Sequence, residues 1–291
     1  MLASEIVGRL EKIAPLSLAF EDDPVGLVFG DPNKVVKKVG VAWAITDYVM
    51  EQANLLEVTQ EIKPRKISPL HARFALRKKT PEEVEADIDM FVLHEYPFFE
   101  EKRAIFPGIS FFEKPPNAKR IKRLAAKDVC VYVMHSNLDD AEGGTADALA
   151  KVLGMHVVEK FKCGRIGEIA ETTLGNIVST LKTSYLCDVI RITGDVESSK
   201  PITKVGCFIG PGLKYIDVIE EMYLKGAQVV VSSEMTETVA RYADDLGISL
   251  IDIERSRLER LIMQNLAEKL ERDLKGITVM HYECEDSISY V

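Results

Sequence analysis

The chain has 291 residues, 46% of them apolar and 29% charged, which is the composition of a globular protein with one large or two medium domains. Its 37 Lys and Arg residues against 46 Asp and Glu residues give a net charge of −9, which argues against nucleic acid as a partner. Charged residues interrupt the N-terminal segment, and no apolar run approaches the ~18 residues of a membrane helix, so we expect a cytoplasmic protein with no membrane partner.

Hydrophobic periodicity predicts alternating helices and strands along the chain. In chain order the predicted elements are a helix at 2–14, an apolar segment at 26–30, a buried strand at 39–45, a helix from 47 to about 56, a strand at 90–96, a basic helix at 116–127, a strand at 129–135, a polar loop at 135–144, a helix at 145–154, a strand at 204–210, a helix at 214–226, a strand at 227–235 and a long helix from about 255 to 274.

Two stretches of the sequence follow the same pattern. KVGV at 38–41 is similar to KVGC at 204–207, and a helix and then a strand follow each of them. This similarity predicts an internal duplication of a strand–helix–strand unit, and therefore an α/β protein with mostly parallel strands. We place the two halves at 1–125 and 126–291, with C-terminal elements that could pack back on the first half.

Residues 57–90 have the composition of an insertion. They are polar, contain Pro64 and Pro69 in their middle part and carry eight basic side chains between residues 63 and 79, counting His71. We expect a lobe that does not build the central sheet. This basic run and a second one at 114–127 could contact a phosphate backbone, but such runs are more often solvated, and no interleaved aromatic residues indicate stacking on bases. Nucleic acid is therefore not the expected partner.

Ionisable residues follow three predicted strands where each strand ends. They are His94-Glu95, then His135 with Asp139 and Asp140, and then Asp252, which leads into the helix that carries Arg255 and Glu259. Because parallel strands place their carboxyl ends at one edge of a sheet, these groups could converge on a divalent metal ion. The alternative stays open that they are hydrogen-bonded histidines, helix caps and a solvated ion pair.

Several segments of the chain resemble one protein family. In order, they are FEDDPVGLVFGDP (20–32), KKVGVA (37–42), FVLHEYPFF (91–99), VYVMHSNLDDAEGGTADALAKVLG (131–154), KVGCFIGPGL (204–213) and the C-terminal segment 226–261. They are similar to the NIF-three-like family, many of whose bacterial members are named GTP cyclohydrolase I type 2 homologues. The resemblance implies an α/β NIF-three-like fold, with two related α/β/α halves around a central cleft.

The resemblance also implies a dinuclear metal site with five ligand positions. Carried onto this chain, those positions are His94, Glu95, Asp139, Arg255 and Glu259. The family has histidine at the second and fourth of them, so this chain departs from the pattern at Glu95 and at Arg255. The Trp-Asp-Asn motif of the family reads Asp22-Asp23-Pro24 here, and the acid that often ends the first strand is replaced by Ala44.

These departures change the metal that the resemblance implies. Glu95, Asp139 and Glu259 would form a set of three carboxylates, which suits Mg²⁺ or Mn²⁺ better than Zn²⁺ or Fe²⁺. The second ion would need Arg255 as a ligand, and a guanidinium repels a cation. We therefore expect at most one ion per subunit, and the site could also bind none.

The resemblance implies a ring-like homo-oligomer, commonly a hexamer, and a metal-dependent hydrolase that acts on an unknown small molecule. In that reading His94 or His135 is the candidate general base. A second hypothesis is a non-catalytic oligomeric binding or assembly protein that has lost the dinuclear centre, and the replacements at Glu95 and Arg255 favour it. A third, nucleic-acid binding through the basic insertion, rests on charge alone.

Overall fold

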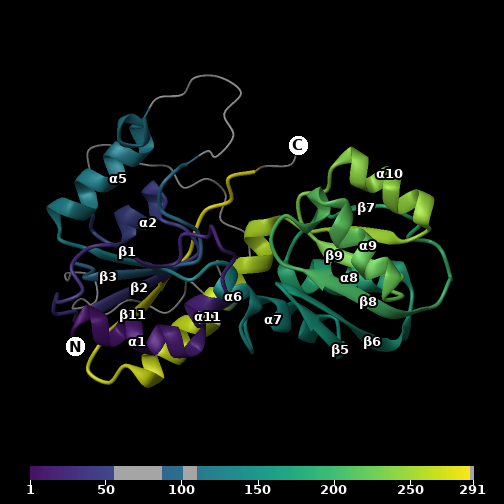
Figure 1. Cartoon of the computed structure of the whole chain (residues 1–291), viewed down its shortest axis with the longest axis horizontal. Coiled ribbons are helices and arrows are strands. Elements are labelled where there is room, and N and C mark those ends of the chain that lie inside the picture. Colours follow the sequence, from purple (N-terminus) through teal and green to yellow (C-terminus); the bar gives the residue numbers. More distant parts are fainter. Residues whose placement is uncertain (56–86, 101–109, 289–291) are drawn as a thin grey trace. The chain divides into compact units, whose positions relative to one another are not determined.

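The computed structural model describes residues 1–55, 87–100 and 110–288, which form two compact units that are described separately below (Figure 1). Unit 1 contains Met1–Asn137 and Met263–Ser287, and unit 2 contains Leu138–Ile262 with the chain end from Ile288. Each unit is built on one β-sheet with helices, so the predicted α/β class is confirmed. Most of the predicted insertion 57–90 lies outside the described residues. Within the described ranges, no helix is long and apolar enough to span a membrane.

The sheet of unit 1 has five strands in the order β1-β4-β3-β2-β11. β11 pairs with β2, β2 with β3 and β3 with β4 in parallel, whereas β1 is antiparallel to β4. Because four neighbouring strands are parallel, their carboxyl ends meet at one edge of the sheet. The strands are β1 (Gly26–Phe29), β2 (Lys38–Ala42), β3 (Met90–Leu93), β4 (Cys130–Val133) and β11 (Thr278–Tyr282).

Helices cover both faces of this sheet, which is why its central strands are apolar on both sides. α1 (Ala3–Ile13) and the later part of α11 (Arg255–Asp273) lie on one face, and α2 (Asp47–Gln52) and α5 (Pro115–Ala126) lie on the other (Figure 1). Phe91, Leu93 and Val131 pack in one apolar cluster with side chains of α2 and α5. Two short 3-10 helices, η1 (Leu16–Leu18) and η2 (Phe111–Glu113), complete the unit.

The sheet of unit 2 has six strands in the order β5-β6-β8-β9-β10-β7. The three central strands β8, β9 and β10 are parallel, and the flanking strands are antiparallel to their neighbours. The strands are β5 (His156–Phe161), β6 (Gly164–Thr172), β7 (Arg191–Ile192), β8 (Ile202–Phe208), β9 (Val229–Ser232) and β10 (Ser249–Asp252).

Alternating side chains of β9 bury both faces of the second sheet. Val229 and Val231 belong to the apolar cluster that includes residues of α7 and α8, whereas Val230 belongs to the cluster that includes residues of α9 and α10. The period of two therefore fixes which helices each side chain contacts. The remaining elements are α6 (Ser136–Asp140), α7 (Thr145–Val152), α8 (Leu174–Tyr185), η3 (Gly212–Lys214), α9 (Ile216–Leu224) and α10 (Glu237–Leu246).

Threonine side chains begin three of the helices. Thr46, Thr173 and Thr236 each accept a hydrogen bond from the backbone N–H three residues later, at the starts of α2, α8 and α10. Such caps satisfy a donor that would otherwise lack a helical partner and are worth about 1 kcal/mol each. At its other end α10 stops at Gly247, whose φ of 69° favours glycine.

The strands of the predicted duplication have similar pairing in the structure, and two other predicted features differ from it. β2 and β8, which carry the KVG sequences, each pair in parallel with the strand that follows the next helix, β3 or β9. The chain passes from unit 1 to unit 2 after Asn137, not near residue 125, because β4 pairs with β1 and β3. The segment 135–144 is not only a loop, since Ser136–Asp140 forms α6.

Candidate functional site

His94, Glu95 and His135 lie at the carboxyl edge of the unit 1 sheet. His94 and Glu95 directly follow β3, and His135 follows β4 by two residues, so the parallel pairing of β3 with β4 brings the three side chains together. The backbone is fixed at this point because the N–H groups of His94 and Glu95 donate to the Trp43 carbonyl at 3.2 and 2.8 Å. The sequence predicted that these three residues would converge because they follow parallel strands, and in unit 1 they lie together.

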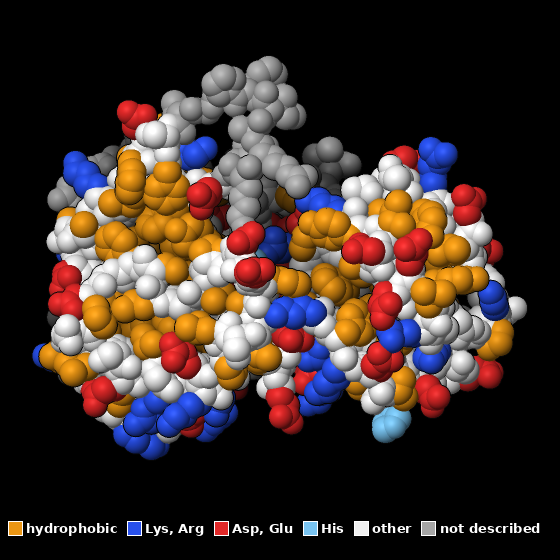
Figure 2. Space-filling model, viewed as in Figure 1, with side chains coloured by type: hydrophobic (Ala, Val, Ile, Leu, Met, Phe, Trp, Pro, Cys, Tyr) orange, Lys and Arg blue, Asp and Glu red, His pale blue; other side chains and the backbone are white. Residues whose placement is uncertain are grey.

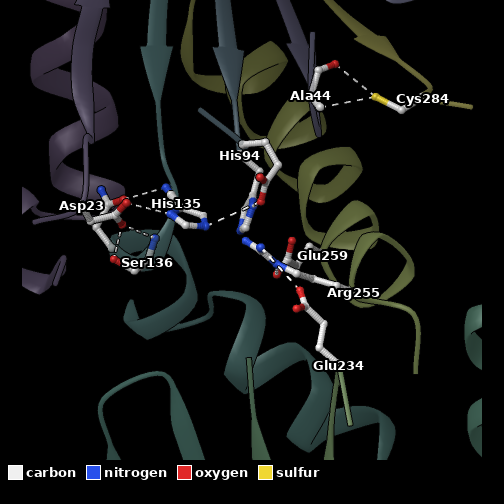
Figure 3. A network of polar contacts seen from close by, with 11 residues as sticks. Asp23, Ala44, His94, His135, Ser136, Glu234, Arg255, Glu259 and Cys284 are labelled. Atoms are coloured by element: carbon white, nitrogen blue, oxygen red, sulfur yellow. Dashed lines mark hydrogen bonds and ion pairs between the residues drawn. The ribbon is translucent and has the colours of Figure 1, made fainter. Parts of the chain in front are cut away.

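The three side chains are close enough to share an ion. Figure 3 shows the rings of His94 and His135 in this group. The two imidazole rings are perpendicular, with centroids 5.2 Å apart. Glu95 Oε1 lies 3.8 Å from His94 Nδ1 and 3.6 Å from His135 Nε2. One potential ligand atom from each residue lies within 4.8 Å of the others. His94 is fully buried, whereas Glu95 and His135 are each 26% exposed, so the group is open to solvent on one side.

Asp23 holds His135 from the side opposite Glu95. Its Oδ1 lies 2.8 Å from His135 Nδ1, and its Oδ2 accepts hydrogen bonds from the backbone N–H and the hydroxyl of Ser136 (Figure 3). Ser136 Oγ in turn accepts from the Phe20 N–H at 3.0 Å, so the turn that carries Asp23 is bonded to the start of α6. Sequence reasoning named Asp23 only as part of a changed motif and missed this contact, which spans 112 residues.

Asp23 is ionised at any working pH. Burial alone would raise its pKa, but the hydrogen bond and charge of His135 and the two bonds from Ser136 outweigh burial and lower the pKa to about 2. A carboxylate can only accept, so His135 Nδ1 carries the proton that is donated to Asp23. In the neutral ring Nε2 is then a lone-pair acceptor that faces Glu95 Oε1 at 3.6 Å. A second proton, a water molecule that donates hydrogen bonds, or a metal ion between these two acceptors would satisfy both of them.

Unit 2 contains the other predicted ligands. Asp139 lies on α6 and Glu259 on α11, both buried, and a carboxylate oxygen of each lies within 4.8 Å of the other. Arg255, one helical turn before Glu259, donates from Nε to Glu259 Oε1 at 2.8 Å, and its Nη1 lies 3.9 Å from Glu234 Oε1 (Figure 3). The guanidinium therefore supplies the positive charge that the Glu259 carboxylate requires.

Two acids that the sequence suggested have structural roles in unit 2. Asp140 Oδ1 accepts from the Cys163 N–H at 3.0 Å and lies 3.5 Å from the buried Arg165. Asp252 accepts from the backbone N–H groups of Glu234 and Met235 at 2.9 and 3.1 Å, which fixes the turn after β9. These two carboxylates therefore hold local backbone, and neither belongs to the potential metal-ligand groups of the described residues.

Comparisons with known proteins agree on one family. A sequence model described as Duf34/NIF3 (NGG1p interacting factor 3) matches residues 1–59 and 77–287, and the omitted residues 60–76 lie within the predicted insertion. The chain is 22% identical to a GTP cyclohydrolase 1 type 2 homolog of Clostridium perfringens over 303 residues, covering 100% of both chains, and 26% identical to a homolog of the same name from Lactococcus lactis over 98% of this chain and 97% of that one. Among solved structures, reduced HcgD from Methanocaldococcus jannaschii has a TM-score of 0.70 at 22% identity and 97% coverage of each chain, which shows a shared fold.

Proposed function

The chain belongs to the Duf34/NIF3 family, and from that membership we propose that it is a divalent-metal-dependent hydrolase whose ion is held by His94, Glu95 and His135. The observation that carries the proposal is the 3.6 Å approach of Glu95 Oε1 to His135 Nε2, with Asp23 bonded to the other ring nitrogen. A carboxylate behind a metal-binding histidine is the usual support for such a ligand, because it fixes the ring and its tautomer.

The chemistry of this donor set fits one ion. Two imidazole nitrogens and one carboxylate oxygen suit Mn²⁺, Fe²⁺ or Zn²⁺, and three protein ligands leave positions for water and substrate. The expected set of Glu95, Asp139 and Glu259 would instead favour Mg²⁺ or Mn²⁺, so Mn²⁺ is the ion that both sets accept. When bound, such an ion lowers the pKa of a coordinated water and polarises a substrate bond.

The residues of unit 1 have separate roles in this proposal. His94 and His135 are ligands and not general bases, because a ring nitrogen that binds an ion cannot also take up a proton. Asp23 keeps the proton of His135 on Nδ1 and so presents Nε2 to the ion. The buried His94 and the partly exposed Glu95 leave the solvent side for substrate.

Arg255 limits the metal content to one ion in this proposal. It stays protonated because the pKa of arginine is above ~12, and it already pairs with Glu259 at 2.8 Å. A second ion at Glu259 would have to displace a fixed cation. The same contact favours the second candidate function, a non-catalytic binding or assembly protein, since it removes a ligand position that the family uses. The family likeness also supports a homo-oligomer, which we propose to be a hexamer, and a cytoplasmic location stays a prediction.

Metal content separates the two candidate functions. We expect apo protein to take up one equivalent of Mn²⁺ or Zn²⁺ in calorimetric titration, and Glu95→Gln or His135→Ala to weaken binding more than about 100-fold, since even supporting residues change affinity by about 10–100-fold. Glu283→Gln is the matched control, because Glu283 also lies near a histidine, His281, at 3.5 Å in unit 1. No uptake by the wild-type protein would favour the non-catalytic candidate, and equal uptake by the Glu95 variant would refute Glu95 as a ligand.

A further inference from the structure

Two phenylalanine side chains of unit 1 are unusually exposed. Phe112, in η2, is 72% exposed, and Phe99, in the segment after β3, is 54% exposed. A large ring that faces solvent forgoes about 1.5–3 kcal/mol of burial free energy, so such exposure often marks a contact surface. The neighbouring rings behave differently, because Phe98 is buried and Phe111 is partly buried against it, with centroids 5.7 Å apart.

A buried asparagine holds both exposed rings on one rigid support. Asn117, in the first turn of α5, is 0% exposed and uses three hydrogen bonds. Its Oδ1 accepts from the Phe99 N–H at 2.7 Å, and its Nδ2 donates to the Phe99 carbonyl at 2.9 Å and to the Phe111 carbonyl at 3.0 Å. The segments that carry Phe99 and Phe112 are therefore fixed to the same side chain, and through it to α5.

α5 is strongly basic and contains no acidic residue. Its residues Pro115–Ala126 include two lysines and two arginines, with Lys114 just before the helix and Lys127 just after it. Arg120 donates to the Pro97 carbonyl, and its guanidinium lies 4.7 Å from the centroid of the Phe99 ring. Figure 2 shows Lys and Arg side chains beside exposed hydrophobic ones where Figure 1 places α5.

The cations of α5 differ in what they contact. Lys119 and Arg123 both pair with Asp47, and Lys127 pairs with Asp87. Within the described part of the chain, no carboxylate forms an ion pair with Lys114 or Lys122, and Lys122 is exposed. Of the cations of α5, Arg120 lies over the Phe99 ring, and Lys122 is an exposed cation of the same helix, although the protein as a whole is acidic.

We propose that Phe99, Phe112 and the basic side chains Arg120 and Lys122 form a binding surface for single-stranded nucleic acid. Exposed aromatic faces stack on bases, an arginine over a ring adds a second planar surface, and lysines attract the phosphates. An acidic peptide would satisfy the cations but would leave the two rings without a planar partner. Double-stranded nucleic acid would offer phosphates but no free base faces. The surface includes none of the proposed metal ligands. The sequence did not predict nucleic acid as a partner, because the rings and the helix come together only in the fold.

The test is fluorescence anisotropy with a labelled 20-nucleotide oligothymidylate and the full chain at 50 mM salt. We expect a salt-dependent dissociation constant in the roughly 1–100 µM range that is typical of binding without sequence preference. Phe112→Ala and Phe99→Ala should each weaken binding about tenfold, the lower end of the range for one stacked base. Lys122→Ala should reduce the slope of log K against log salt by about 0.7, the value for one phosphate on a single strand.

Matched controls lie in unit 2. Tyr223 is a 43% exposed aromatic residue of α9, and Tyr223→Ala should leave oligothymidylate binding unchanged. Phe112 is so exposed that its truncation should not alter the unfolding midpoint, which is measured for every variant. Absence of binding at 50 mM salt would overturn the proposal. Binding that survives both phenylalanine replacements would also overturn it, and so would equally tight binding of a duplex of the same length. Competition by poly-glutamate with equal affinity would overturn it as well and would indicate an acidic protein partner.

Discussion

The hydrogen-bonded contact between Asp23 and His135 should make the stability of the protein depend on pH in a defined window. Asp23 has a pKa of about 2 in the folded protein against an ordinary value of 3.8. Because one pKa unit corresponds to about 1.36 kcal/mol, the folded state favours the ionised carboxylate by about 2 kcal/mol. A group whose pKa is lowered by folding contributes stability above its unfolded pKa, and this contribution is lost as the pH falls from about 4 to about 2.

The perturbation that tests this reasoning is Asp23→Asn, which keeps an oxygen acceptor for His135 Nδ1 but removes the titrating carboxyl. Between pH 7 and pH 3 the wild-type chain should lose about 1 kcal/mol through Asp23, and about 2 kcal/mol by pH 2. The asparagine variant should lack this component and should be less stable than the wild type at pH 7. Urea unfolding in the presence of a chelator, followed by circular dichroism, gives both free energies at each pH.

A matched control separates Asp23 from general effects of acid. Asp188→Asn makes the same chemical change at an exposed position of unit 2, and it should leave the pH dependence as it is in the wild type. If Asp23→Asn and the wild type lose equal free energy between pH 7 and pH 3, the contact with His135 does not lower the pKa of Asp23 and the reasoning fails.

Three further predictions follow from particular residues. Arg255→His removes the guanidinium from Glu259 and, combined with Glu95→His, should raise metal content above one equivalent per subunit in elemental analysis; a folded double variant that binds no additional metal would contradict the assignment of these positions. Gly40→Ala places a methyl group 2.8 Å from the ring of Phe91 and 2.9 Å from that of Tyr282, so the free energy of unfolding should fall by about 1–3 kcal/mol, whereas an unchanged urea midpoint would refute the overpacking. Light scattering at micromolar concentration should give a mass near six subunits, and a monomer of 32.5 kDa would refute the assembly.

The sequence predicted best what depends on local pattern. The segments that became β2, β3, β4 and β8 contain short apolar runs, and the carboxyl ends of parallel strands must share an edge, so the convergence of His94, Glu95 and His135 could be predicted from the sequence.

What the sequence could not reveal depends on contacts between distant segments. Asp23 reaches His135 across 112 residues through a turn with no periodicity. Phe99 and Phe112 are apolar residues, which a sequence pattern would place in the core. The hydrogen bonds of Asn117 hold their chain segments to α5, and this contact appears only in the fold. The short helix α6 begins directly after His135, where Ser, Asn and Asp residues favour turns and helix starts about equally, so the sequence pattern indicated a loop.

The position of β11 also determines the order in which the chain can fold during synthesis. β11 lies beside β2 in the same sheet, Thr278 opposite Lys38, although about 240 residues separate them, whereas the residues of unit 2 up to Ile262 are continuous in sequence. At about 5–20 residues per second, the ribosome needs roughly 12–48 seconds to make the intervening chain. During that time the outer edge of β2 has no partner strand, while unit 2 can already be completed. A chain released after residue 262 would therefore contain the continuous part of the second unit and an exposed strand edge in the first, which is a substrate for chaperones and for aggregation.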